Sequence, residues 1–289
     1  MASFQGMKIN PNKFHISQLK FYMVIVPIAL FMTLPIVYII NQAFKPLDEI
    51  FRFPPTFIAR RHTLQNFRMI WSLTSNTGIP MSRFLINTII ITVLTVVLSI
   101  FITAMSAYAF SKKKFGVKEW LFRLNQAALM FVPAAVSIPR YLIIVKLGLN
   151  NNFLVHILPI IAMPVGLFLV KQFVDQVPDS LIESARIDGA GEITVMFKIV
   201  FPLIKPALAT VGILCFQMVW GATEASNLYL VDDTLKSFAF YLTSLATLNT
   251  PAMAGVQAAA SLIMFLPNLI IFIAMQSRVM NTMSHSGIK

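Results

Sequence analysis

The chain has 289 residues, of which 57% are apolar and 12% are charged, and its mean hydropathy is +0.76. A soluble domain of this size carries about twice that share of charged residues, so the composition excludes an ordinary soluble protein and indicates a membrane protein. The net charge of +12 could suggest a nucleic-acid partner, but the basic residues form short clusters between apolar runs, which argues against nucleic acid and is typical of positively charged inner loops.

The chain begins with a polar stretch, residues 1–20, that contains lysines and no acid. We predict that this stretch is cytoplasmic and that the apolar run after it is a retained span, because no cleavage-site pattern follows a short apolar core. Residues 278–289 form a tail that is predicted to be cytoplasmic as well. The predicted fold is all-α, with six transmembrane helices near residues 21–40, 84–110, 124–145, 153–170, 202–223 and 254–277.

Two segments outside these spans leave alternatives open. Residues 41–83 are predicted to lie outside, yet they carry more lysine and arginine than acid. Either a long loop crosses the membrane regardless of charge, or its outer surface faces an acidic ligand or binding protein. Residues 237–253 are apolar but contain several hydroxyl side chains, Asn249 and Pro251. We predict a short helix at the membrane face or a partly re-entrant segment there, not a seventh span.

A polar segment, Val177 to Leu203, separates the fourth and fifth predicted spans. Pro178 opens it, and Ser180 and Glu183 have the spacing of a capping box, which satisfies free N–H groups at a helix start. Gly189 is predicted to stop the helix. The result is a helix of about ten residues, roughly 15 Å long, which is too short to cross a bilayer.

The spacing of this segment is similar to a known motif. Residues 183–185 read Glu-Ser-Ala, Gly189 follows three residues later, and residues 199–202 read Ile-Val-Phe-Pro after nine more. This resembles the EAA loop of ABC-importer permeases, which runs Glu-Ala-Ala, three residues, Gly, nine residues, Ile-x-Leu-Pro. The chain departs from that pattern at Ser184 and Phe201. Residues 185–190 also resemble the sugar-importing branch of the family.

In that family the loop is a cytoplasmic coupling helix that sits in a cleft of a separate ATPase subunit. The resemblance therefore implies that five residues couple this chain to an ATPase: Glu183, Ser184, Ala185, Asp188 and Gly189. The competing interpretation is an amphipathic helix lying on lipid, but such helices are usually rich in lysine and arginine, whereas this one carries several acids.

The resemblance covers the chain from the first span to the tail and implies a type I importer permease of the maltose-permease-like sugar group. It implies a bacterial inner (plasma) membrane protein that imports a saccharide by ATP-driven alternating access. Its expected partners are a second, related permease in a heterodimer, two ATPase subunits, an extracytoplasmic solute-binding protein and membrane lipid.

No catalytic constellation is found, so the chain is not predicted to be an enzyme. The four histidines are scattered, without metal-ligand spacing, and no phosphate-binding loop is present. We therefore expect no cofactor, with ATP bound by partner subunits. An ion-coupled secondary carrier is the alternative function, but it needs paired ionisable groups in mid-membrane, and none is evident.

Polar groups within spans are costly in lipid, so they are candidates for contact with a transported molecule. Four such residues lie on the fifth span and its outer end: Gln217, Trp220, Glu224 and Asn227. The first three are predicted to share one helical face. An aromatic ring that stacks on a sugar ring and polar groups that bond to its hydroxyls are what a sugar site needs. The other interpretation is ordinary interhelical hydrogen bonding. Arg140, in the third span, is expected near its outer end.

The substrate is harder to predict. The tail, residues 284–289, resembles the tails of permeases for complex oligosaccharides, and residues 41–83 are basic. Together they favour an acidic oligosaccharide of the alginate or rhamnogalacturonan type.

Overall fold

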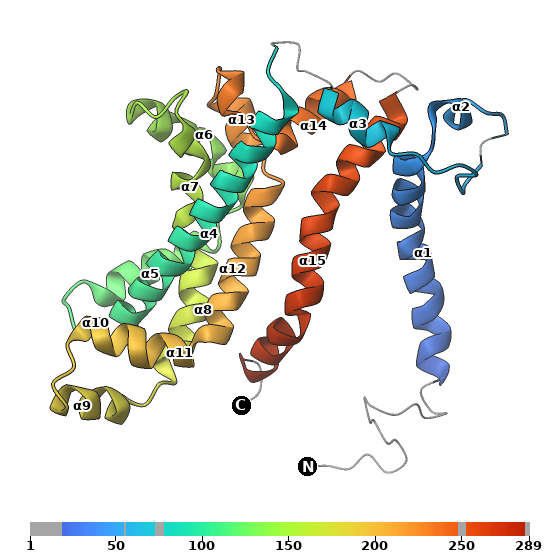
Figure 1. The fold of residues 1–289 in the computed structure, drawn as a ribbon. Helices are drawn as coiled ribbons and strands as arrows, with labels where there is room; N and C mark the ends of the chain where they lie inside the picture. Colours follow the sequence, from blue (N-terminus) through green and yellow to red (C-terminus); the bar gives the residue numbers. More distant parts are fainter. Residues whose placement is uncertain (1–18, 55, 73–77, 248–252, 287–289) are drawn as a thin grey trace. The chain divides into compact units, whose positions relative to one another are not determined.

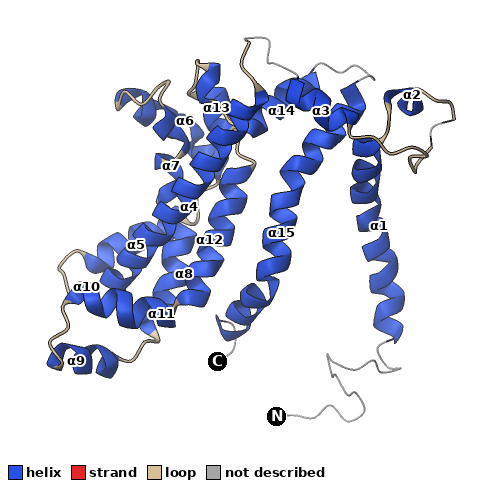
Figure 2. Cartoon of the chain, viewed as in Figure 1, coloured by secondary structure: helices blue, strands red, loops and turns tan. Residues whose placement is uncertain are grey.

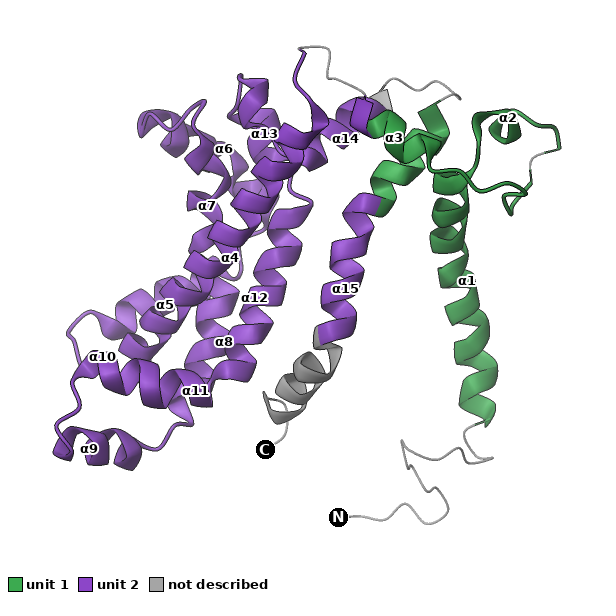
Figure 3. Cartoon of the chain, in the orientation of Figure 1, with its two compact units in different colours: residues 1–70, 249–262 green, residues 71–248, 263–289 purple. Residues whose placement is uncertain are grey.

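The computed structural model describes residues 19–54, 56–72, 78–247 and 253–286. These ranges fold into helices joined by turns and loops, and they contain no β-strand (Figure 2). The all-α class predicted from the sequence is therefore confirmed. The chain divides into two compact units (Figure 3), which consist of residues 1–70 with 249–262 and of residues 71–248 with 263–289.

The first unit starts with α1 (Leu19–Phe44), which contains Pro27 and Pro35 and is exposed along most of its length. A helix that is apolar on all sides is typical of a membrane span. Two short helices follow it, α2 (Leu47–Ile50) and α3 (Gln65–Ser72). The last two residues of α3, Trp71 and Ser72, belong to the second unit.

Buried polar groups fold the segment after α1. Glu49 is 4% exposed, and its carboxylate accepts hydrogen bonds from the backbone N–H groups of Arg60 and Arg61, at 3.0 Å each. Lys45 is also buried and donates to the carbonyl of Thr56 at 2.6 Å. One positively charged side chain of this segment, Lys45, thus stabilises the local fold.

The last part of the first unit is the start of α15 (Ala254–Ser286), where a glycine is required by packing. Asn66 is buried and donates to the carbonyls of Ala43 and Lys45 at 2.9 and 2.8 Å. A Cβ at Gly255 would lie 2.7 Å from the amide of Asn66, so only glycine leaves room for it.

The second unit contains most of the helices (Figure 1). They are α4 (Met81–Lys112), α5 (Lys118–Ala128), α6 (Pro133–Lys146), η2 (Phe153–His156), α7 (Leu158–Ile161), α8 (Pro164–Asp175), α9 (Asp179–Ile187), α10 (Glu192–Thr194), η3 (Val195–Val200), α11 (Phe201–Leu203), α12 (Lys205–Trp220), α13 (Glu224–Leu228), η4 (Asp233–Leu235), α14 (Phe238–Thr247) and the remainder of α15.

Helices α4, α8 and α12 form the core of the second unit, and they pack closely through small residues. A Cβ at Gly212 would lie 3.1 Å from Cδ1 of Ile100, so α12 approaches α4 closely there. The buried face of α4 is mostly small and hydroxyl-bearing, including Thr95 and Ser99, while Val97 and Phe101 are exposed. This arrangement, with polar groups inside and apolar groups outside, is that of a helix surrounded by lipid.

The structure gives the predicted spans a more detailed form. Among the described residues, four helices are long and apolar enough to cross a membrane, and the number rises to six if each of two bent helix pairs is one span. The four are Leu19–Phe44, Met81–Lys112, Lys205–Leu228 and Ala254–Ala274. The third of these comprises α12 and α13, and the fourth is part of α15.

The third and fourth predicted spans are not straight helices. The chain bends by 117° between α5 and α6. It bends by 41° between the segment Phe153–Ile161, which comprises η2 and α7, and helix α8. In both cases the second helix begins with a proline, Pro133 or Pro164, at the position where its fixed φ suits a helix start. These prolines therefore mark new helix starts inside the predicted spans.

The region predicted as a short or re-entrant helix, residues 237–253, contains α14, which has ten residues. This helix is too short to cross a bilayer. Residues 248–252, which complete the predicted segment, lie outside the described residues.

Candidate functional site

The segment predicted to couple the chain to an ATPase contains a nine-residue helix, α9. Its N-cap is Pro178, and no side chain caps its start. The predicted capping box between Ser180 and Glu183 is therefore wrong, because the helix begins at Asp179 and Ser180 lies inside its first turn. Lys112 of α4 bonds to the segment instead, through the carboxylate of Asp179 at 2.7 Å and the carbonyl of Val177 at 2.6 Å.

The end of α9 has the geometry predicted from its glycine. Gly189 has φ +83°, a left-handed conformation that glycine adopts without strain. The N–H of Ala190 donates to the carbonyl of Ala185 at 2.9 Å, and the N–H of Gly189 donates to Arg186 at 3.0 Å. These two bonds form a Schellman motif, so the end of the helix has a fixed shape.

One side of α9 faces the core and the other is open. Ile182 is buried, and Ala185 packs partly against the core cluster of the second unit. The exposed side carries Glu183, Ser184, Asp188 and Ile187, whose side chain is 86% exposed. The predicted coupling residues are therefore mostly available to a partner, with Ala185 as the half-buried exception.

A second cluster ties the segment to α4. Glu192 accepts from the hydroxyl of Tyr108 and from Arg186, at 2.8 Å each, and forms an ion pair with Lys113. The hydrogen bond from Lys113, followed by that from Tyr108, lowers the pKa of Glu192. The bond from Lys112 likewise lowers the pKa of Asp179. Movement of the segment would consequently be transmitted to α4.

A cavity of about 470 Å³ lies in the same unit, at the breaks of the third and fourth predicted spans. Its walls come from α4, the α5–α6 and α7–α8 breaks, α12 and α13. Most of the lining is apolar, and its two side chains that are charged at neutral pH are Arg140 and Glu224. Nη1 of Arg140 lies 3.3 Å from both carboxylate oxygens of Glu224.

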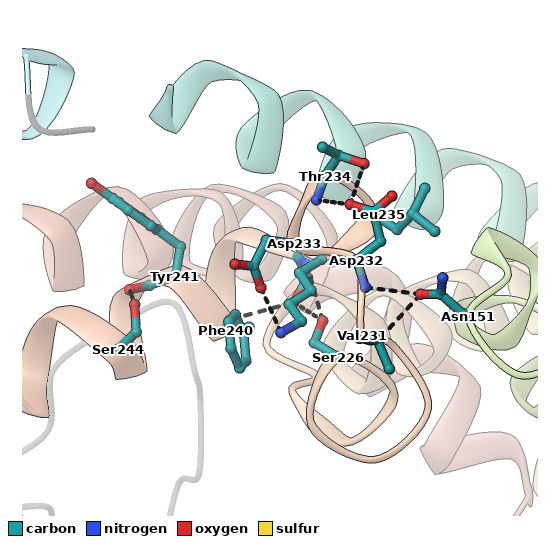
Figure 4. A network of polar contacts seen from close by, with 12 residues as sticks. Asn151, Ser226, Val231, Asp232, Asp233, Thr234, Leu235, Phe240, Tyr241 and Ser244 are labelled. Atoms are coloured by element: carbon teal, nitrogen blue, oxygen red, sulfur yellow. Dashed lines mark hydrogen bonds and ion pairs between the residues drawn. The ribbon is translucent and has the colours of Figure 1, made fainter. Parts of the chain in front are cut away.

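The loop from α13 to α14, which borders the cavity, is held by side-chain hydrogen bonds (Figure 4). Asn151 has φ 55°, and its Oδ1 accepts from the N–H groups of Val231 and Asp232 at 3.0 and 2.8 Å. Asn87 of α4 donates to Thr234 at 2.7 Å, and the ring of His156 bonds to the carbonyl of Leu235 at 3.1 Å. Asn151, Asn87 and His156 therefore hold the loop from three different elements.

The structure separates the four predicted substrate-path residues. Glu224 lines the cavity, whereas Gln217 and Asn227 are exposed and do not line it. Trp220 is 7% exposed, donates from Nε1 to the carbonyl of Met264 at 3.0 Å and stacks on Phe216. That contact is the interhelical hydrogen bond that the sequence left as an alternative.

The single helical face predicted for Gln217, Trp220 and Glu224 does not form. Helix α12 ends at Trp220, with Gly221 as its C-cap, and Glu224 begins a new helix, α13. A substrate contact by these residues stays a prediction.

Sequence reasoning missed the cavity itself. Its walls combine residues that are far apart in the chain. Arg140 and Glu224, which form an ion pair in the cavity, are 84 residues apart in the sequence. The available signal was the prolines inside the third and fourth spans, among them Pro133 and Pro164, which line the cavity.

Together, the membrane-length helices, the broken spans and an exposed short helix between two of them define a polytopic membrane protein. The family model for the inner membrane component of binding-protein-dependent transport systems matches residues 25–277. The chain belongs to this family, whose members are membrane permease subunits of ABC importers and not enzymes.

Curated relatives agree with this assignment. A probable ABC transporter permease protein of Bacillus subtilis, YurM, is 30% identical over 258 residues, which cover 88% of this chain and 83% of that protein. The arabinooligosaccharides transport system permease protein AraQ of Halalkalibacterium halodurans is 30% identical over 91% of this chain and 93% of that protein. The melibiose/raffinose/stachyose import permease MelC of Bacillus subtilis is 29% identical, with 78% and 81% covered.

A solved structure shares the fold. A chain of a bacterial ABC transporter involved in the import of the acidic polysaccharide alginate matches with a TM-score of 0.79 and 22% identity. The match covers 92% of this chain and 98% of that one. At this identity the likeness establishes the fold alone.

Proposed function

We propose that the chain is the permease subunit of an importer that carries an oligosaccharide into the cytoplasm, driven by ATP hydrolysed on separate subunits. The observation that carries the proposal is α9, a short helix fastened to α4 whose exposed side bears Glu183, Ser184 and Asp188. Relatives named as permeases for arabino-oligosaccharides and for melibiose, raffinose and stachyose support the saccharide class.

The proposed mechanism couples α9 to the transmembrane helices. The exposed side of α9 docks in a cleft of an ATPase subunit, and closure of two such subunits on ATP displaces it. Because Lys112 and Lys113 bind the segment to the end of α4, the displacement reaches that helix directly. The transmembrane helices then change from an inward-facing to an outward-facing state, which is a two-state transition biased by ATP.

The proposed assembly contains this chain and a second, related permease as a heterodimer, with two ATPase subunits and an extracytoplasmic solute-binding protein. ATP is bound by the ATPase subunits, and both termini of this chain are cytoplasmic in a bacterial inner membrane. The positive clusters between the predicted inner ends of the spans, such as Lys112, Lys113 and Lys114, support this orientation.

Within the saccharides, an acidic oligosaccharide is the finer proposal. The basic segment at residues 41–83 supports it. Uptake of neutral oligosaccharides with none of uronates would contradict it. The alternative of an ion-coupled carrier is not favoured, because the family to which the chain belongs consists of ABC importer permease subunits.

The direct test is capture of the candidate ATPase by the detergent-solubilised protein. Glu183→Lys combined with Gly189→Leu changes the exposed side and the end of α9, and is expected to abolish capture. Glu119→Lys, an equal charge reversal at an exposed site on α5, serves as the control and is expected to retain it. Equal capture by both variants at equal membrane levels would refute the coupling function of α9.

A further inference from the structure

The cavity of the second unit has two helix starts in its wall. Pro133 and Val136 belong to the first turn of α6, Pro164 and Val165 belong to the first turn of α8, and all four line the cavity. Neither helix has a side chain that caps its N-terminus. The first turn of a helix presents unpaired N–H groups and a partial positive charge, so both starts favour an anion in the cavity.

The breaks that create these helix starts are joined to each other. Asn125 of α5 donates from Nδ2 to the carbonyl of Pro164 at 3.2 Å. Both bent helix pairs therefore contribute to one wall of one cavity. Membrane transporters commonly bind anionic groups at the starts of broken helices.

A full positive charge lies in the same cavity. The Arg140 side chain is 32% exposed and that of its partner Glu224 is 46% exposed. The two contacts between them measure 3.3 Å each, which is longer than the roughly 2.7–2.9 Å of strong charge-assisted hydrogen bonds. Arg140 thus already holds one carboxylate, loosely and within reach of solvent, and its planar fork suits another carboxylate equally well.

A buried hydroxyl lies in the same wall without a partner. Tyr229 is 2% exposed, lines the cavity and stacks on Tyr141 with ring centroids 6.0 Å apart. Its hydroxyl makes no hydrogen bond among the described residues. A buried polar atom without a partner is costly, and a ligand or water that entered the wall beside Tyr229 would satisfy it.

We propose that this cavity binds a sugar residue bearing a carboxylate, a hexuronate, with the carboxylate on Arg140 in place of Glu224. A volume of about 470 Å³, a mainly apolar lining and a few polar groups are typical of a small-molecule site. A neutral sugar cannot displace Glu224 from Arg140, so the ion pair selects for the acid. The inference deepens the proposed function and rests on it for the saccharide class.

The test labels a thiol in the cavity and measures protection. Met218 lines the cavity and is 55% exposed, so Met218→Cys in a Cys215→Ala background, which removes the buried native thiol, gives one reactive site. The labelling rate of the detergent-solubilised full chain is measured with D-galacturonate, D-galactose or acetate at equal concentration. These sugars differ only in whether C6 is a carboxylate or a hydroxymethyl group.

Galacturonate is expected to slow labelling at least threefold, whereas galactose and acetate leave the rate unchanged. Arg140→Gln is expected to abolish the protection and Arg140→Lys to retain part of it. Glu224→Gln, which frees Arg140, is expected to give protection at lower galacturonate concentrations. Equal protection by galactose or by acetate, no protection by galacturonate, or protection that survives Arg140→Gln would overturn the inference.

ATPase capture measured on the same preparations separates this inference from the proposed function. Capture without galacturonate protection refutes the uronate site and leaves the permease function standing. Protection without capture supports the site and refutes the ATP-driven mechanism.

Discussion

The coupling segment around α9 and the cavity at the helix breaks are both polar regions of the second unit, but they are built differently. The coupling segment is nearly continuous in sequence, from Val177 to Leu203, and among the described residues its distant hydrogen-bond partners come from the end of α4. The cavity draws on seven α-helices and on residues from Thr88 to Ser237. A local site has a continuous signature in the sequence, whereas this cavity is marked only by separate prolines at the helix breaks.

The charges of the two regions also differ in their bonding. In the coupling segment Asp179 and Glu192 each have a lysine partner, and Glu192 also binds Tyr108 and Arg186. These bonds hold the segment to α4. In the cavity a single loose pair, Arg140 with Glu224, is open to exchange. The first arrangement suits the transmission of movement and the second suits the binding of a ligand.

The largest expected effect breaks the local geometry of the coupling segment. Gly189→Val places a β-branched residue at φ +83°, a conformation that costs other residues roughly 1–2 kcal/mol, and we expect at least a tenfold loss of ATPase capture. Gly116→Val is the matched control. A Cβ at either glycine would meet no atom within 4 Å, and only Gly189 has a positive φ, so the pair isolates backbone conformation. A similar loss in both variants would contradict the account.

A smaller effect separates Trp220 from the cavity. Trp220→Phe keeps an aromatic ring on Phe216 but removes the hydrogen bond to Met264, and we expect a loss of about 1 kcal/mol in stability. Thermal unfolding in detergent measures it. Galacturonate protection of the labelled thiol should be unchanged. Loss of protection without loss of stability would move Trp220 into the substrate path.

A modest effect tests the attachment of α9 to α4. Asp179→Asn removes the charge that Lys112 binds, and we expect hydrogen exchange across residues 177–190 to become about two- to threefold faster, as a weakened exposed ion pair implies. Glu119→Gln removes a comparable exposed charge on α5 and should leave this exchange unchanged. Unchanged exchange in Asp179→Asn would show that the lysine does not hold the segment.

The smallest effect is a pH dependence confined to the coupling segment. The pKa of Glu192 is lowered in the folded state, so its bonds stabilise the segment fully above the ordinary value of 4.5 and are lost as the pH falls below it. Hydrogen exchange of residues 190–200, divided by the intrinsic exchange rate at each pH, should therefore rise below pH 4.5 in the wild type. Glu192→Gln should show no such rise. An equal rise in the variant would assign the effect to another group.

The sequence predicted the helical class, the presence of several membrane-length helices and the short helix after the fourth predicted span. It also predicted the glycine at the end of that helix, because Gly189 acts through local backbone geometry. It did not predict the bend of 117° after α5, since a proline inside a span is compatible with both a kink and a new helix start. The partner of Arg140 was equally inaccessible, because pairing across spans depends on how the helices pack.

The most direct test of the central claim asks whether α9 contacts an ATPase. A photoreactive maleimide on the thiol of Ser184→Cys, in the Cys215→Ala background, should cross-link to the ATPase in the purified importer. The same reagent on Asn227→Cys, an exposed position on α13, should not; α13 and α9 lie at opposite ends of the second unit (Figure 1). Cross-linking from Ser184→Cys alone is the result the account predicts. A co-purifying ATPase that cross-links from neither position, or from both equally, would contradict it.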